Sequence, residues 1–316
     1  MAGAQSMPHL ADGSLVDHLI MVDEFEARDF RWKNLRLLVK EHLDCSLKGE
    51  KSSIKILDLG CGTGHLALDL IREGYHVSAA DVSKELVDFA NRKAQEAGFE
   101  LNAVQMDIQE LLCREAFDAI VCLDVLEHVG DDRLAMANIY QALRSGGIMI
   151  CAVPALSALY GKRDKRIGHY RRYDRGVLLQ LIKSMGFSIC AIRYWNSLGL
   201  FMVAIFEKIL HREVYEKNRY SQSYLNRSLN ALLDRWFGLV ENRVHPPLGL
   251  TLIAVARKPG HSHDLRNGIR LGTNRINDIS WQIAPPSGQS ALSSPIHKIP
   301  APGNRPFARY SSQKPI

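Results

Sequence analysis

The chain has 316 residues, of which 46% are hydrophobic and 23% are charged. These fractions are close to the globular average and exclude a disordered, fibrous or coiled-coil protein as a whole. The length suits one large domain, or one domain of roughly 250 residues with appendages. Much of the net charge of +6 lies near the C-terminus, since residues 259–316 hold seven Lys/Arg and two Asp/Glu.

The cysteines and the apolar runs bear on the cellular compartment and on membrane insertion. The six cysteines are scattered without a C-x-x-C pair, which disfavours a zinc site or a disulfide framework and favours a reducing compartment. The first 13 residues lack the features of a secretory signal, and the apolar run 198–206 is far shorter than the ~20 residues of a membrane span. We expect a soluble, cytoplasmic protein, with peripheral membrane contact left open.

Strand-like and helix-like patterns alternate from residue 54 onward. The expected strands are 54–59, 75–80, 101–106, 117–123, 148–153, 187–194 and 250–256. The expected helices between them are 66–72, 84–97, 131–144 and 177–185. This alternation predicts parallel βαβ units in a doubly wound α/β sheet.

Other segments do not alternate, and they suggest the domain organisation. Residues 14–44 have the spacing of one or two amphipathic helices, which predicts an N-terminal helical cap over residues 1–52. Residues 53–258 form the predicted main domain, with a helical insertion or lid at 197–240 before the last strand. Residues 259–316 lack apolar periodicity and predict a disordered basic tail, either simply solvated or able to bind nucleic acid or an anionic membrane.

A glycine loop follows the first strand and reads Asp58-Leu59-Gly60-Cys61-Gly62-Thr63-Gly64. With Ala67, the last two glycines also match the G-x-G-x-x-G/A dinucleotide pattern, which is a weak signal alone. A pyrophosphate favours amides and a helix N-terminus rather than the carboxylate of Asp58. S-adenosylmethionine has no phosphate and carries an amino group and a sulfonium, so it suits this loop better.

Two further acids follow the next two strands. Asp81 is placed to accept both ribose hydroxyls, and Asp107 can accept from the adenine amino group. Val82 and Ile108, which come directly after these acids, complete the predicted contacts there. All three acids lie at the carboxyl ends of strands, where doubly wound sheets bind ligands. One acid alone would suggest a helix cap, but three together with the glycine loop predict a nucleoside site.

The D-x-G-x-G-x-G loop with Asp81 and Asp107 resembles the class I S-adenosylmethionine-dependent methyltransferases over roughly residues 30–258. The resemblance implies a Rossmann-like, seven-stranded, mostly parallel sheet whose last strand is antiparallel. Residues 121–129, VCLDVLEHV, resemble the ubiquinone-biosynthesis O-methyltransferases, whose pattern is close to C-M-E-M-L-E-H-V. Residues 34–37, NLRL, resemble that family's N-x-x-R-L. The likeness implies cofactor contacts from Arg36, Gly60, Asp81 and Leu123, with the arginine on the cofactor carboxylate.

The same likeness bears on catalysis. In some relatives two acids and the histidine of this segment hold Mg²⁺, and the matching positions here are Asp124, Glu127 and His128. Asp124 replaces a usual glutamate and has a shorter side chain. Without a metal, His128 is the candidate general base, since an unperturbed histidine has a pKa of ~6.5. Base and metal ligand are alternatives for this one histidine.

A basic segment over residues 161–175 holds seven Lys/Arg and two Asp, interleaved with histidine and tyrosine. We expect His169, Tyr170 and Arg171 to contact an anionic group of the substrate, and a plain solvated loop is the alternative. The family has a G-T-H-like stretch here, so its substrate is not carried over.

Together these features predict an enzyme that O-methylates a small, partly apolar substrate with an anionic group, such as a phenolic, polyprenyl or lipid-like molecule. The apolar front of the insertion suggests a lid, a dimer face or a cover over a lipophilic substrate. An RNA methyltransferase is an alternative because of the basic segments, although no N/D-P-P-Y/F motif follows the fourth strand. A non-catalytic, cofactor-binding partner subunit is another.

Overall fold

The computed structural model describes residues 12–203 and 224–260. The centre of the predicted insertion and the predicted tail from residue 261 onward therefore lie outside the described residues. The chain divides into two units, residues 1–263 and 264–316, and all the described residues belong to the first. Among them, no helix has the length and apolar character needed to cross a membrane.

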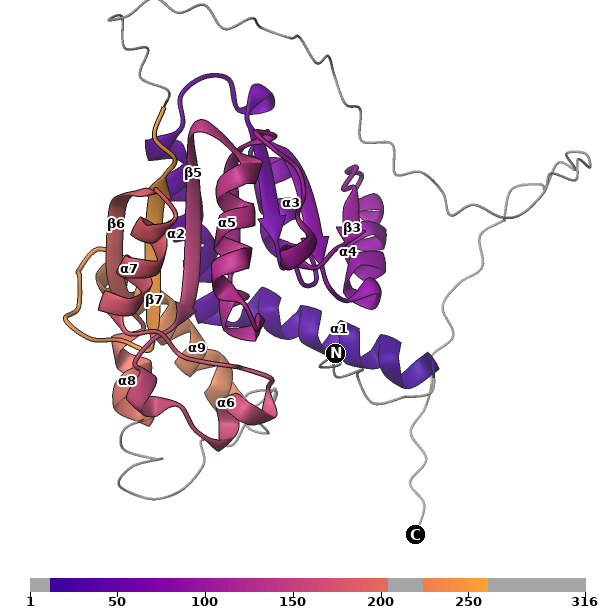
Figure 1. Cartoon of the computed structure of the whole chain (residues 1–316). Helices are drawn as coiled ribbons and strands as arrows, with labels where there is room; N and C mark the ends of the chain where they lie inside the picture. Colours follow the sequence, from indigo (N-terminus) through magenta and orange to yellow (C-terminus); the bar gives the residue numbers. More distant parts are fainter. Residues whose placement is uncertain (1–11, 204–223, 261–316) are drawn as a thin grey trace, which may run out of the picture. The chain divides into compact units, whose positions relative to one another are not determined.

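Seven strands form one sheet in the order β3-β2-β1-β4-β5-β7-β6 (Figure 1). The strands are β1 (Lys55–Leu59), β2 (His76–Asp81), β3 (Ala103–Gln105), β4 (Phe117–Leu123), β5 (Leu143–Pro154), β6 (Ser188–Trp195) and β7 (Thr251–Arg257). Strands β1 to β5 run parallel, and β7 runs antiparallel to both neighbours, β5 and β6. The predicted doubly wound, mostly parallel α/β sheet with an antiparallel last strand is confirmed.

Helices cover both faces of this sheet (Figure 1). They are α1 (Asp12–Arg28), α2 (Phe30–Ser46), α3 (His65–Arg72), α4 (Lys84–Glu96), α5 (Asp132–Ala142), α6 (Lys162–Arg166), α7 (Arg175–Ser184), α8 (Ser197–Val203) and α9 (Tyr224–Trp236). Leu57 and Leu59 of β1 pack in one core with α5 and α7. Ile56, on the opposite face, packs in a second core with α2, α3 and α4. Alternate side chains of one strand thus fill both cores, as expected for a parallel sheet buried on both sides.

The N-terminal segment forms two helices that meet at Asp29. The Asp29 carboxylate accepts hydrogen bonds from the backbone N–H groups of Arg31 (2.9 Å) and Trp32 (3.2 Å), which caps α2. Such a cap satisfies amides that have no partner within the helix. In Figure 1, α1 lies below the strands, at the same end of the sheet as α6, α8 and α9.

Two elements differ from the sequence prediction. Strand β5 begins at Leu143 rather than at residue 148, because the expected turn at Ser145-Gly146-Gly147 continues the strand across a register shift opposite Phe117 and Ala119. Gly146 makes this irregularity possible, since its φ is +80°. The short helix α6 was not expected inside the basic segment. Asp164 stabilises it by accepting a hydrogen bond from the Gly161 N–H at 2.9 Å.

Deletion of the tail tests the predicted domain boundary. Truncation after Lys258 should leave the thermal midpoint nearly unchanged, because the later sequence lacks the apolar spacing of a packed element. Lys258 itself must stay, since its buried Nζ donates to the Leu143 carbonyl at 2.7 Å. Thermal unfolding followed by circular dichroism should show Lys258→Met, in the full chain, melting lower than the truncated protein. The opposite order would contradict the boundary.

Candidate functional site

The glycine loop after β1 turns sharply and closely approaches its neighbours. Gly60, Gly62 and Gly64 have φ values of +77°, +54° and +81°, a region that L side chains rarely adopt. The N–H groups of Gly60 and Cys61 both donate to the Ala80 carbonyl, at 2.8 and 3.0 Å. A Cβ at position 60 would lie 2.2 Å from Val125 Cγ2. The loop therefore depends on glycine at position 60 for space as well as for φ.

Asp58 lies in β1 beneath this loop and is 3% exposed. Burial, helped by the charge of nearby Asp81, raises the pKa of its carboxyl to about 7. Its Oδ2 atom has no hydrogen-bond partner among the described residues. A buried carboxylate oxygen without a partner is costly, and a bound cation would relieve that cost.

The acids after β2 and β3 make local hydrogen bonds. Asp81 accepts from the N–H groups of Gly62 and Ser83, both at 3.0 Å, and so ties the glycine loop to the end of β2. Asp107 accepts from the Gln109 N–H at 2.8 Å and caps a short 3₁₀ helix. Of the residues that follow them, Val82 is exposed and Ile108 is buried in the core.

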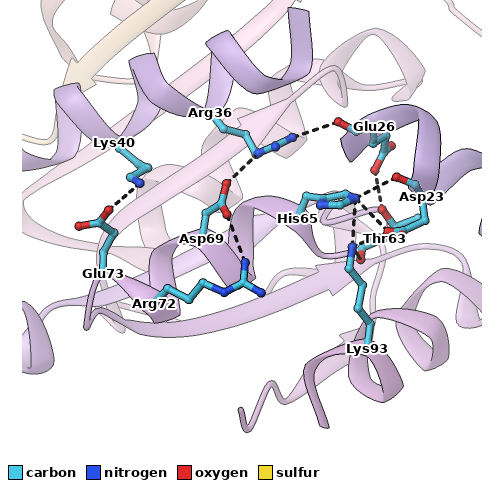
Figure 2. Close-up of polar contacts among 10 residues, drawn as sticks. All are labelled: Asp23, Glu26, Arg36, Lys40, Thr63, His65, Asp69, Arg72, Glu73 and Lys93. Carbon is cyan, nitrogen blue, oxygen red and sulfur yellow. Dashed lines mark hydrogen bonds and ion pairs between the residues drawn. The ribbon is translucent and has the colours of Figure 1, made fainter. Parts of the chain in front are cut away.

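Helix α1 lies against the glycine loop, a contact that sequence reasoning missed (Figure 2). Thr63 Oγ1 donates to the Glu26 carboxylate at 2.5 Å, and burial raises the pKa of Glu26. Asp23 of the same helix pairs with His65 at 2.9 Å and with Lys93 of α4. Amphipathic spacing predicted the helix, but no local signal indicated which part of the domain it would contact.

Arg36, the predicted ligand of the cofactor carboxylate, lies beside the same loop (Figure 2). Its Nε atom donates to the Asp69 carboxylate of α3 at 2.9 Å, and a terminal nitrogen reaches the Glu26 carbonyl at 3.4 Å. The side chain is thus held close to α1 and α3 by two contacts. Leu123, another predicted cofactor contact, is partly buried at the end of β4.

The predicted catalytic residues follow β4. Asp124 has a φ of +51°, and its Oδ2 lies 3.6 Å from an Arg31 guanidinium nitrogen. Glu127 is 0% exposed, and neither of its carboxylate oxygens has a hydrogen-bond partner among the described residues. Burial, and then the charge of Asp124, raises the pKa of Glu127 well above its usual value. Desolvation by the surrounding protein lowers the pKa of His128, although the residue is exposed.

The basic segment folds back onto this turn. His169 Nε2 lies 3.9 Å from Glu127 Oε1, and the rings of His169 and His128 meet edge to face with centroids 4.6 Å apart. The Tyr170 N–H donates to the Glu127 carbonyl at 2.7 Å, while its side chain is 57% exposed. Arg171 pairs with Asp132 at 2.7 Å. The structure thus places His169 next to the predicted catalytic residues, whereas Arg171 forms an ion pair with Asp132.

The ligand set implied for Mg²⁺ does not assemble as the resemblance suggests. Among the described residues, the group whose potential ligand atoms lie within 4.8 Å of one another is Glu127, His128 and His169. Asp124 is instead near Arg31. Two imidazoles and one carboxylate are a poor match to Mg²⁺, which favours oxygen ligands in octahedral geometry.

Comparison with known proteins relates part of this chain to methyltransferases. Residues 56–147 match the family described as "Methyltransferase domain". The chain is 37% identical over 99 residues to the ubiquinone biosynthesis O-methyltransferase of Rickettsia prowazekii (strain Madrid E), covering 31% of this chain and 39% of the relative. The corresponding enzyme of Rickettsia canadensis (strain McKiel) is 35% identical over 99 residues, covering 31% and 42%. The matched segment thus spans about two fifths of these curated relatives.

A solved structure has the same fold over most of its length. It is that of a Galdieria sulphuraria protein assigned as a sarcosine dimethylglycine methyltransferase, with a TM-score of 0.51 and 18% identity over 71% of this chain and 84% of that chain. The chain therefore has the Rossmann-like fold of that structure, and its residues 56–147 match a methyltransferase domain. The predicted resemblance to the ubiquinone-biosynthesis O-methyltransferases is confirmed for the matched segment.

Alanine at two glycines of the loop tests the close approach at position 60. Both residues have positive φ, but a Cβ at Gly62 would meet only the Glu26 carboxylate, at 3.7 Å. Gly60→Ala should therefore lower the free energy of unfolding by about 1–3 kcal/mol more than Gly62→Ala, the usual cost of overpacking. Urea denaturation measures both values. Equal losses would show that the loop can move away from Val125.

Proposed function

We propose that the protein transfers a methyl group from S-adenosylmethionine to a hydroxyl group of a small, partly apolar acceptor. The observation that carries the cofactor assignment is the buried, unpartnered oxygen of Asp58 beneath a glycine loop at the carboxyl end of the sheet. An ammonium group would supply the missing partner, whereas a pyrophosphate would be repelled. When bound, the cofactor supplies an electrophilic methyl group on a sulfonium.

The other predicted contacts surround this point. In the proposal, Asp58 binds the cofactor ammonium, the backbone of Gly60, Gly62 and Gly64 lines the cofactor, and Asp81 with Val82 meets the ribose. Asp107 and Ile108 lie by the adenine, and Leu123 closes the site from β4. Arg36 would bind the cofactor carboxylate while sharing its guanidinium with Asp69, since a guanidinium has five N–H donors.

In the proposed mechanism His128 removes the proton of the acceptor hydroxyl. Its lowered pKa keeps the imidazole neutral near pH 7, so that one ring nitrogen can accept a proton. Positioning the hydroxyl in line with the methyl group would supply much of the remaining rate.

The acceptor class follows from the surroundings and the relatives. The relatives matched over this segment are named O-methyltransferases, which supports oxygen as the methyl acceptor. Helices α8 and α9 of the insertion lie at the same end of the sheet as α1 (Figure 1), and they carry four exposed apolar residues, Phe201, Leu229, Leu232 and Trp236. We propose that the apolar part of the acceptor contacts this surface, and that the exposed Tyr170 and the basic segment meet its anionic group.

Cofactor affinity should depend on the ionisation of Asp58. Because its pKa is raised to about 7, the carboxyl is largely neutral at lower pH and cannot attract a cation. The dissociation constant for S-adenosylmethionine should rise as pH falls from 7 to 5, approaching about tenfold per unit. Calorimetry of Asp58→Asn should show weaker binding at pH 7 and no such rise, whereas the exposed Asp88→Asn serves as control and should match wild type. Tight binding of NAD would overturn the cofactor assignment.

Loss of His128 should affect the chemistry and spare the cofactor. His128→Ala should lower kcat by about 10²–10⁴ while leaving the cofactor dissociation constant unchanged, the usual contribution of a positioned base. The wild-type rate should fall on the acid side with a midpoint below ~6.5, since the folded pKa is lowered and only the neutral ring accepts a proton. Assays with labelled cofactor on phenols and polyprenyl-phenols measure this, with the exposed His76→Ala as control. Near-normal kcat in His128→Ala would exclude the histidine as base.

A further inference from the structure

The side chains of Glu127, His128 and His169 converge beside the turn after β4, and their potential ligand atoms lie within 4.8 Å of one another. They come from two segments far apart in sequence, which the fold joins through the hydrogen bond between the Tyr170 N–H and the Glu127 carbonyl. Glu127 is fully buried, and its carboxylate oxygens have no hydrogen-bond partner among the described residues. A carboxylate in such a place needs a proton or a cation.

A second, buried carboxylate fixes the orientation of His169. Asp164 is 1% exposed, and its Oδ1 lies 3.2 Å from His169 Nδ1 and 2.8 Å from Arg172 Nε. Its other oxygen accepts from the Gly161 N–H. With the Nδ1 proton directed to Asp164, the Nε2 atom presents a lone pair toward the Glu127 carboxylate, 3.9 Å away. When Glu127 is ionised, two groups that both accept face each other across a short gap.

We propose that Glu127, His128 and His169 form a binding site for a divalent transition-metal ion such as Zn²⁺, with Asp164 as the residue that orients His169. A histidine that donates one ring N–H to a carboxylate and binds metal through the other nitrogen is the usual arrangement in zinc proteins. Two imidazoles and one carboxylate are also a common zinc set that leaves a fourth position open. Binding would draw the three ligand atoms to about 3.4 Å from one another, given metal–ligand distances of ~2.0–2.1 Å.

The charges around the site favour a cation of this kind. Arg31 is near Asp124, and Arg172 binds Asp164, so these two acids already have cationic partners. Glu127 has only His169 within ion-pair distance among the described residues. Carboxylates bind metal in the ionised form, so metal binding would displace any proton that the buried Glu127 holds. The nitrogen-rich set distinguishes this site from the oxygen-rich one that Mg²⁺ favours.

This inference goes beyond the proposed methyl transfer and does not depend on it. One nitrogen of His128 cannot hold a metal and accept a proton at the same moment, so a bound metal and the proposed base describe two states of the protein. Metal binding can be measured without an acceptor, and cofactor binding without a metal. The failure of either proposal is therefore visible separately.

The experiment titrates Co²⁺, a spectroscopic substitute for Zn²⁺, into the full-length, untagged protein after chelator treatment. We expect one equivalent to give the strong visible absorption of a four-coordinate site, Zn²⁺ to displace it, and millimolar Mg²⁺ not to compete. Glu127→Gln and His169→Ala should weaken binding by at least about 100-fold, and Asp164→Asn by about 10–100-fold as an orienting residue. Asp124→Asn and the exposed His76→Ala are matched controls and should bind like the wild type.

Two further measurements keep the result unambiguous. Zn²⁺ should raise the thermal midpoint of the wild type and not that of His169→Ala, because only a folded site binds the ion. Calorimetry should show unchanged S-adenosylmethionine affinity in His169→Ala, which confirms that the variant is folded. The proposal is overturned if His169→Ala binds Co²⁺ like the wild type, if Asp124→Asn abolishes binding, or if no stoichiometric site exists.

Discussion

The backbone of Gly60 passes so close to the turn after β4 that a Cβ there would lie 2.2 Å from Val125 Cγ2. This approach brings the glycine loop after β1 next to the segment that holds Asp124, Glu127 and His128. The same loop is held from the other side by the Ala80 carbonyl and the Asp81 carboxylate. The absence of a side chain at Gly60 therefore lets the proposed cofactor contacts lie next to the proposed catalytic residues.

Several carboxyl groups around the site share a second property, which is that they are buried. Burial raises the pKa values of Asp58, Glu26 and Glu127, and these three carboxyls lie near the carboxyl ends of β1 and β4. Each would gain from a cation, because a charge removed from water is stabilised mainly by an opposite charge or a hydrogen bond. The Thr63 hydroxyl supplies a hydrogen bond to Glu26, whereas one oxygen of Asp58 and both of Glu127 have none among the described residues. The proposed ammonium group of the cofactor would bind Asp58, and the proposed metal ion would bind Glu127.

Several elements could be predicted because their signals are local. The bounds of β4 follow from an apolar run that only Asp118 interrupts. Gly74, Gly98 and Gly186 follow the helices whose ends they predicted, with φ between +78° and +94°. The start of β5 could not be predicted in this way, since Ser-Gly-Gly ordinarily marks a turn, and only pairing with β4 keeps that stretch in the sheet. Helix α6 is stabilised by a hydrogen bond from Gly161 to Asp164, inside a segment for which the sequence predicted contact with an anionic substrate group or a solvated loop.

The amino-acid sequence by itself determined the order of strands and helices, the glycine loop and the acids near the ends of three successive strands, because periodicity and chain direction place such residues at one edge of a parallel sheet. Tertiary structure decided which distant residues join them. It placed Glu26 of α1 on Thr63, engaged Arg36 with Asp69, and brought His169 to Glu127 while Asp124 approached Arg31. These contacts depend on how helices and loops pack across long stretches of chain, and no local pattern encodes that packing.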